Sequence, residues 1–258
     1  MPDPKRLSLS RLIQAWTHAP GAWFFDLDGT LIDIADHPDA VRVPKRLLTV
    51  LTRLTAAGYP RLAVVSGRAL DNLGGLADWP SALALVGNHG GEYAVDGRRW
   101  RETLPPVAEQ AMNRWRPTLT ERIREMPGVF LEDKGLSLTV HVRQAHPTEL
   151  PRLARLLREL EADSQALTVR KALKAWEIRP REGPTKAQAI HTLLTLWNQT
   201  RPGAIFGDDW TDEDGFRAFP NALTVIVGHR RPTEAHYRIA SPRVLRAMLE
   251  ALLAYRYR

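Results

Sequence analysis

Residues 22–33, AWFFDLDGTLID, place the acidic side chains of Asp26 and Asp28 directly after an apolar run. A continuous apolar run is typical of a strand that is buried on both faces of a parallel sheet. Ligands of such sheets bind beyond the carboxyl ends of the strands. The stretch therefore predicts a parallel sheet with a functional site at the end of one of its strands.

Apolar runs of the same kind recur and alternate with helical patterns. The other strand-like runs lie at residues 61–68, 202–214 and 222–229. Helical spacing of apolar residues falls at residues 44–57, 185–199 and 241–255. Strands that alternate with helices predict an α/β domain, in which helices cover both faces of the parallel sheet. The segment LSRLIQAW near the start predicts one further helix, packed on this domain.

The pattern changes in the middle of the chain. Two helical segments each precede a hairpin, in the order 107–123, 129–143, 153–160 and 167–180. In LSLTVHVR, residues 136–143, apolar and polar side chains alternate strictly, which is typical of an antiparallel sheet with one open face. The sequence thus predicts an α+β module inserted into the α/β domain. The predicted domains are 1–105 for the first part of the core, 106–180 for the module and 181–258 for the second part of the core.

Composition limits the classes of protein. The chain has 258 residues, 44% of them hydrophobic, and no cysteine, so disulfide and thiolate chemistry are excluded. No stretch approaches the roughly 18 uninterrupted apolar residues of a membrane helix. The first residues, MPDPKRLSLSRLIQAW, lack the apolar core of a secretory signal. We expect a cytoplasmic protein that does not associate with membranes.

The formal net charge of +7 raises the possibility of nucleic-acid binding. The basic residues, however, are scattered among acidic ones in helical segments such as NRWRPTLTERIREM, as on a solvated surface. No nucleic-acid recognition motif accompanies them. The charge fits a small anionic substrate equally well, and we predict a phosphorylated small molecule rather than a nucleic acid.

Polar residues end the predicted core strands. These endings are Asp26 with Asp28, then Ser66, Gly67 and Arg68, and finally Asp208 with Asp209. Taken singly, an aspartate can cap a helix, a glycine can permit a turn, and Ser66 or Lys186 can be a loop or solvated residue. Two strands that direct carboxylates at one edge of a sheet would repel each other unless a cation or altered protonation relieves them.

Magnesium fits this cluster because it prefers a few hard oxygen ligands and keeps waters and substrate phosphate in its other positions. Asp26 and Asp208, with a backbone carbonyl at Asp28, make a partial ligand shell. Asp212, in the turn after the late strand, is predicted to support the ion or its waters. The predicted metal-binding residues are therefore Asp26, Asp28, Asp208 and Asp212.

The same residues suit phosphoryl transfer. A carboxylate can attack phosphorus and form an aspartyl-phosphate, and Asp26 is the candidate nucleophile. Asp28 can protonate the leaving oxygen and later deprotonate the attacking water. Ser66 and the N–H of Gly67 can bind the phosphoryl oxygens, and Lys186 can balance their charge.

Four segments, in order, carry a resemblance to a known family. DLDGTL, VVSGR, the later Lys186 and GDDWTDED resemble the four motifs of the haloacid-dehalogenase-like phosphatases. The resemblance implies a Rossmann-like core with a parallel sheet, bound Mg²⁺ and an aspartate nucleophile. The inserted module resembles the cap domain of that family, with its antiparallel sheet.

A narrower resemblance covers most of the chain. GNHGGEY (87–93), LEDKGLSLTVHVR (131–143), WEIRP (176–180), GDDWTDEDGF (207–216) and TEAHYRIASPRVL (233–245) are similar to segments of the trehalose-6-phosphate phosphatases. The resemblance implies hydrolysis of trehalose 6-phosphate to trehalose and phosphate. It also implies that six residues lie near the sugar or its phosphate: Asn88, His89, Lys134, His141, Glu177 and Arg179. Arg68, at the end of the second core strand, is a further predicted substrate-binding residue.

Two alternatives stay open at this point. The core chemistry would be identical in a phosphatase for another sugar phosphate, such as sucrose 6-phosphate or a mannosyl phosphate. A non-catalytic module that binds a phosphosugar, or docks on a synthase, could carry the same folded core.

Overall fold

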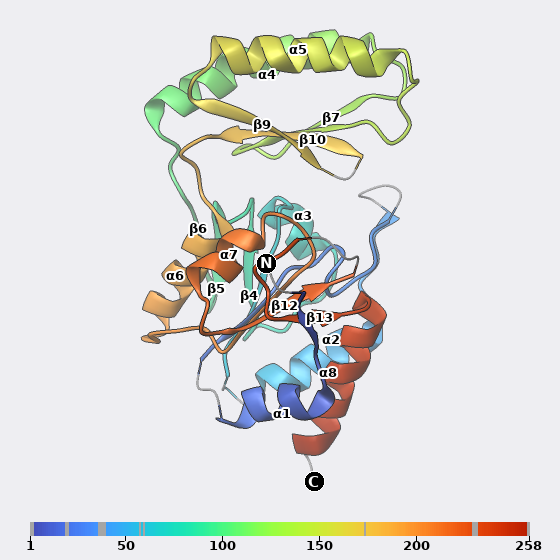
Figure 1. The fold of residues 1–258 in the computed structure, drawn as a ribbon. Coiled ribbons are helices and arrows are strands. Elements are labelled where there is room, and N and C mark those ends of the chain that lie inside the picture. The colour runs from blue at the N-terminus through green and yellow to red at the C-terminus, as the bar shows by residue number, and fades with distance from the viewer. Residues whose placement is uncertain are drawn as a thin grey trace. The chain divides into compact units, whose positions relative to one another are not determined.

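The computed structural model describes residues 3–18, 21–35, 40–56, 58, 60–172, 174–228 and 232–256. The chain divides into two compact units (Figure 1). The first unit consists of Met1–Arg101 with Thr185–Arg258, and the second is Glu102–Pro184. One unit is therefore built from two separate parts of the chain, with the other inserted between them.

The first unit contains a nine-stranded sheet in the order β1-β13-β12-β11-β2-β3-β4-β5-β6. All neighbours from β1 to β4 are parallel, which confirms the predicted parallel sheet. The bounds are β1 (Lys5–Arg6), β2 (Trp23–Phe25), β3 (Leu62–Val65), β4 (Ala84–Gly87), β5 (Glu92–Val95), β6 (Arg98–Arg101), β11 (Ala204–Gly207), β12 (Leu223–Val227) and β13 (Tyr237–Ile239).

The antiparallel hairpin of β5 and β6 at one edge was not predicted. Its turn is Asp96-Gly97, with φ values of 50° and 77°, a pair that suits the tight turns of hairpins. Tyr93 stacks on Trp100 across the two strands, with ring centroids 4.6 Å apart. The Asp-Gly dipeptide was thus a signal that sequence reasoning could have used.

Helices cover both faces of this sheet because its strands are apolar on both sides. Trp23 and Phe25 of β2 pack in one cluster with α1, α2, α3 and α8, whereas Phe24 packs on the other face with α6 and α7. Figure 1 shows α1, α2 and α8 gathered on one side of the sheet. The bounds are α1 (Leu9–His18), α2 (Lys45–Thr55), α3 (Leu70–Gly75), α6 (Lys186–Leu196), α7 (Glu213–Ala218) and α8 (Pro242–Arg256).

The second unit is a four-stranded antiparallel sheet with two helices, as predicted. Its strand order is β7-β8-β10-β9, and Leu138, Val140 and Ile178 pack beneath the helices in one apolar cluster. Figure 1 shows the helices along one face of the sheet. The bounds are α4 (Pro106–Arg124), β7 (Phe130–Asp133), β8 (Leu138–His141), α5 (Glu149–Asp163), β9 (Leu167–Ala172) and β10 (Ala175–Pro180).

The opposite face of this sheet is less open than the alternation of its residues predicts. Ser137 and Thr139 are both buried, although they lie on the polar side. Strand β8 is interior to the sheet, and Thr139 lies between Glu132 of β7 and Glu177 of β10. Thr139 is therefore flanked on both sides by longer side chains, which alternation along one strand does not reveal.

No helix in the described part of the chain is both long enough and apolar enough to cross a membrane.

A capping box stabilises the start of α6. The Oγ1 of Thr185 accepts a hydrogen bond from the backbone N–H of Gln188 (3.2 Å), and the Gln188 side chain accepts one from the N–H of Thr185 (2.9 Å). Removing this capping box by Thr185→Ala is expected to lower the free energy of unfolding by about 1 kcal/mol. Chemical denaturation measures the change.

Thr148 provides the control, because its side chain makes no capping hydrogen bond to α5, and its Oγ1 lies 2.8 Å from Nδ1 of His146 at an exposed position, where such a bond contributes little. Thr148→Ala is expected to leave the free energy of unfolding nearly unchanged. Equal losses in the two variants would show that the capping box contributes nothing.

Candidate active site

Three carboxylates meet at the carboxyl ends of neighbouring parallel strands. Asp26 follows β2 and Asp208 follows β11, and these strands pair in register with Phe25 opposite Phe206. The N–H of Asp26 donates to the carbonyl of Phe206 (2.9 Å), which extends the pairing to the site itself. Carboxylate oxygens of Asp26, Asp208 and Asp212 lie within 4.8 Å of one another. The parallel register therefore brings acids distant in sequence to one point.

Lys186, the first residue of α6, lies among these acids and is only 5% exposed. Its Nζ is 2.7 Å from Oδ1 of Asp26 and 2.7 Å from Oδ1 of Asp212. The other oxygen of Asp212 accepts hydrogen bonds from the N–H groups of Asp208 and Asp209, each at 3.1 Å. Asp212 thus connects the lysine to the loop after β11.

The electrostatics of this cluster are unbalanced, because one ammonium group faces three carboxylates. Burial raises the pKa of Asp26 from 3.8 to about 7; Lys186 opposes that rise and Asp212 adds to it. Burial, with repulsion from Asp26 and Asp212, also holds the pKa of Asp208 well above its usual range. Burial alone would lower the pKa of Lys186, but attraction by Asp212 and Asp26 outweighs it and raises that pKa.

This excess of negative charge fits a divalent cation. Two of the three acids have raised pKa values, so their ionised forms lack enough positive charge nearby. The donors are all carboxylate oxygens, the hard ligands that Mg²⁺ and similar ions prefer. Asp26, Asp208 and Asp212 are therefore the residues that could hold such an ion.

Close backbone approach makes this geometry possible. Gly29 has φ +86°, and a Cβ atom there would overlap the carboxylate of Asp208. A Cβ atom at Gly207 would overlap the side chain of Asp212. Glycine at both positions lets the loops after β2 and β11 bring their carboxylates together.

The side chain of Asp28 does not join the three clustered acids. It forms a two-point ion pair with Arg68, in which Nε donates to Oδ2 (2.6 Å) and Nη2 donates to Oδ1 (2.8 Å). Arg68 also donates to Oδ1 of Asn72 (2.8 Å), which steadies its guanidinium group. Ser66, at the end of β3, is buried and accepts a hydrogen bond from the N–H of Arg68 (3.2 Å).

Asn88 and His89 follow β4 beside this loop, both in the left-handed region with φ values of 49° and 55°. The N–H of Asn88 donates to the carbonyl of Arg68 (2.7 Å), and the N–H of His89 donates to that of Ser66 (3.0 Å). The His89 ring lies so close to Gly67 that a Cβ atom there would collide with it. The ends of β3 and β4 are therefore locked together.

Glu92, which sequence reasoning missed, supports this arrangement. Its Oε2 accepts hydrogen bonds from the N–H of Leu70 at the start of α3 (2.7 Å) and from Nδ2 of Asn88 (3.0 Å). It lies four residues after Asn88 on β5. Because the hairpin of β5 and β6 was not predicted, no pattern indicated that this glutamate faces the site.

The other predicted substrate-binding residues belong to the second unit. His141, Glu177 and Arg179 lie on the sheet face opposite the two helices, as their alternation predicts. The Nε2 of His141 is 2.8 Å from Oε2 of Glu132, and Nζ of Lys134 is 4.0 Å from the same oxygen. Glu132 thus joins two predicted residues.

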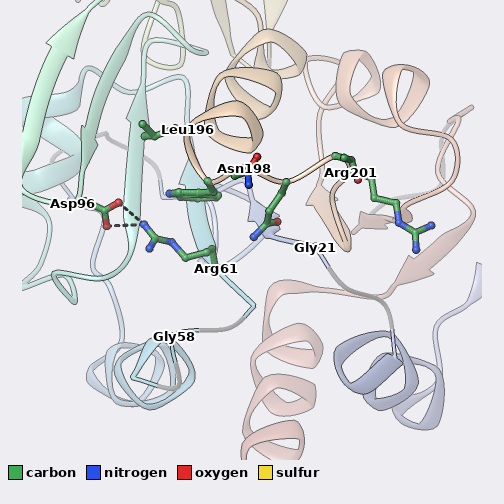
Figure 2. Close-up of a pocket in the computed structure, with 10 residues that line it drawn as sticks. Gly21, Gly58, Arg61, Asp96, Leu196, Asn198 and Arg201 are labelled. Atoms are coloured by element: carbon green, nitrogen blue, oxygen red, sulfur yellow. Dashed lines mark hydrogen bonds and ion pairs between the residues drawn. The ribbon is translucent and has the colours of Figure 1, made fainter.

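A cavity of about 730 Å³ lies near the amino ends of the parallel strands, away from their carboxyl ends (Figure 2). Gly21, Arg61 and Arg201 line it, and each precedes a parallel strand rather than following one. Nη2 of Arg61 pairs with Oδ1 of Asp96 at 2.6 Å, and its guanidinium carbon lies 4.9 Å from the Trp197 ring centroid. The cavity is therefore remote from the acidic cluster.

Comparison with known proteins agrees with this architecture. The C-terminal domain of Candida albicans trehalose-6-phosphate phosphatase superposes with a TM-score of 0.81 at 21% identity, covering 98% of this chain and 99% of that one. The parallel core with an inserted antiparallel unit defines the haloacid-dehalogenase-like fold, in which the inserted unit corresponds to the cap domain.

Sequence comparison identifies the family. The trehalose-phosphatase family profile matches residues 24–242. Trehalose-6-phosphate phosphatase of Escherichia coli (strain K12) is 34% identical over 225 residues, covering 85% of this chain and 81% of that protein. The chain belongs to the trehalose-phosphatase family. Trehalose-phosphate phosphatase of Mycobacterium avium (strain 104) is 33% identical over 238 residues, covering 86% of this chain but only 59% of that longer protein.

The raised pKa of Asp26 predicts that cation binding depends on pH. At pH 6 an ion must displace a proton from a carboxyl group with a pKa of about 7, whereas at pH 8 the group is ionised. The affinity for Mn²⁺, measured from the free-ion paramagnetic resonance signal, is expected to be at least about tenfold higher at pH 8, and the raised pKa of Asp208 adds to this difference. Without the ion, the folded state binds the extra proton, so stability falls as pH rises from about 4 to about 7.

Two variants sharpen this test. Asp208→Asn is expected to remove most of the affinity for Mn²⁺ and to stabilise the ion-free protein, because it deletes a buried, repelled charge. Asp78→Asn, at an exposed position, is expected to change neither property. Affinity that is the same at both pH values would contradict the assignment.

Proposed function

We propose that the protein is an Mg²⁺-dependent phosphatase that hydrolyses trehalose 6-phosphate to trehalose and phosphate. The observation that carries the chemistry is the buried Lys186, set 2.7 Å from both Asp26 and Asp212 beside Asp208. Membership in the trehalose-phosphatase family supports the substrate. A cytoplasmic location stays a prediction.

The proposed reaction has two displacements. An oxygen of Asp26 attacks phosphorus, the bond to the sugar oxygen breaks, and Asp28 donates its proton to that oxygen. Water then attacks the aspartyl-phosphate, Asp28 takes a proton from it, and Asp26 is regenerated as phosphate leaves. When bound, Mg²⁺ would neutralise part of the charge on the phosphoryl group.

The remaining core residues are proposed to bind the phosphoryl group. The hydroxyl of Ser66 and the N–H of Gly67 donate to its oxygens, and Lys186 balances the charge that develops on them. Lys186 is suited to this because its raised pKa keeps it charged. Arg68 is proposed to bind the substrate, and when it does so the Asp28 carboxyl group is free to reach the leaving oxygen.

The residues proposed to bind the sugar or its phosphate come from both units. The sugar hydroxyls need directional partners, because a buried hydroxyl without one costs roughly 1–3 kcal/mol. Carboxylates, a histidine and basic groups on one face of the cap sheet supply such partners. The proposed set is Asn88, His89, Lys134, His141, Glu177 and Arg179.

Phosphate release tests the proposal directly. Wild-type protein is expected to release phosphate from trehalose 6-phosphate with Mg²⁺ and to stop when the ion is chelated. Asp26→Asn is expected to abolish turnover but keep substrate binding, and Asp28→Asn is expected to slow turnover by about 10²-fold or more. Faster hydrolysis of sucrose 6-phosphate, judged by kcat/KM, would instead assign the protein to another sugar phosphate.

A mimic of the phosphorylated aspartate tests the nucleophile. Beryllium fluoride with Mg²⁺ is expected to raise the Tm of the wild-type protein, because the ion and the adduct on Asp26 bind only the folded state. Asp26→Asn should show no such rise, while Asp78→Asn should behave as the wild type. A rise that persists in Asp26→Asn would mean that another residue carries the adduct.

A further inference from the structure

The polar face of the cap sheet contains one large apolar side chain. Among the described residues of that sheet, Phe130 is the large hydrophobic residue that is exposed, with 49% of its surface accessible. It lies opposite His141 in register, and His141 lies opposite Ala175. Since Leu131 and Val140 face the helices, Phe130 and His141 face the other way. Phe130, His141 and Ala175 thus form one row across three neighbouring strands, in which two rings are followed by a small side chain.

Phe130 is held in place rather than left to move in solvent. Its ring stacks on that of His141, with centroids 5.5 Å apart and an interplanar angle of 26°. The Nε2 of His141 is in turn 2.8 Å from Oε2 of Glu132. A carboxylate thus fixes the imidazole, and the imidazole supports the phenyl ring.

A second row of the same face is polar. Glu132 lies opposite Thr139, Thr139 lies opposite Glu177, and Glu177 lies opposite Arg170. Thr139 is 6% exposed, and within the described part of the chain its hydroxyl has no hydrogen-bond partner. Aromatic and polar rows are therefore adjacent, and a buried hydroxyl in the polar row lacks a partner.

This combination matches the surface of a pyranose ring. The hydroxyl groups around such a ring need directional partners, while the C–H groups on its face pack on flat aromatic surface. We propose that Phe130 is a specificity-determining residue, whose ring packs against a sugar ring of the substrate and favours sugar phosphates over compact phosphoryl donors. The inference rests on the proposed function and adds a residue to it.

Steady-state kinetics of the full-length protein test this inference. Packing on the sugar is present in both the bound substrate and the transition state, so its loss changes KM rather than kcat. Phe130→Ala is expected to raise KM for trehalose 6-phosphate about tenfold with little change in kcat. The constants for acetyl phosphate, which has no sugar ring, should be unchanged, and Phe130→Tyr should restore the wild-type KM.

Val107→Ala is the matched control, because Val107 is an apolar residue of α4 in the same unit and is 65% exposed. It is expected to leave both substrates unaffected. If Phe130→Ala behaves like Val107→Ala, or impairs both substrates equally, the inference is overturned while the proposed function stands. If the wild type fails to hydrolyse trehalose 6-phosphate yet hydrolyses acetyl phosphate, the proposed function itself fails and the inference falls with it.

Discussion

The structure of the site depends on an electrostatic imbalance at the ends of two adjacent strands. Asp26, Asp208 and Asp212 hold their carboxylates close to one another, and the buried Lys186 contacts two of them. Such an arrangement is unfavourable in isolation, as the raised pKa values of Asp26 and Asp208 indicate. The rest of the core has to hold it in place, and it is this imbalance that makes a divalent cation the natural complement.

The rigidity comes from the layers beneath. Trp23 and Phe25 of β2 pack against the helices on one face of the sheet, and Phe24 packs against α6 and α7 on the other face. The chain can then place reactive groups on the short loops after the strands without losing their geometry. Gly29 and Gly207 complete the arrangement, since any side chain there would occupy the space of a carboxylate.

In the cap, successive strand residues face opposite sides of the sheet, so each side carries a different kind of side chain. One side of its sheet is apolar and buries against α4 and α5, and the other carries acids, bases and a stacked pair of rings. The core residues thus suit the transfer of a phosphoryl group, which is common to many substrates. In the proposed function, the cap residues bind the hydroxyl groups of the sugar, and members of this family could differ from one another there.

The amino-acid sequence by itself determined most of the elements and their order, although the hairpin of β5 and β6 was missed. Apolar runs, helical spacing and strict alternation predicted the parallel core, the inserted antiparallel unit and the acids at strand ends, because these signals are local. Only the tertiary structure decided that Lys186 is buried between two aspartates, that Arg68 holds Asp28, and that Glu92 supports Asn88. Lys186 and Asp26 are 160 residues apart in the chain. Such contacts arise when strands pair and side chains lose water, and no local pattern records them.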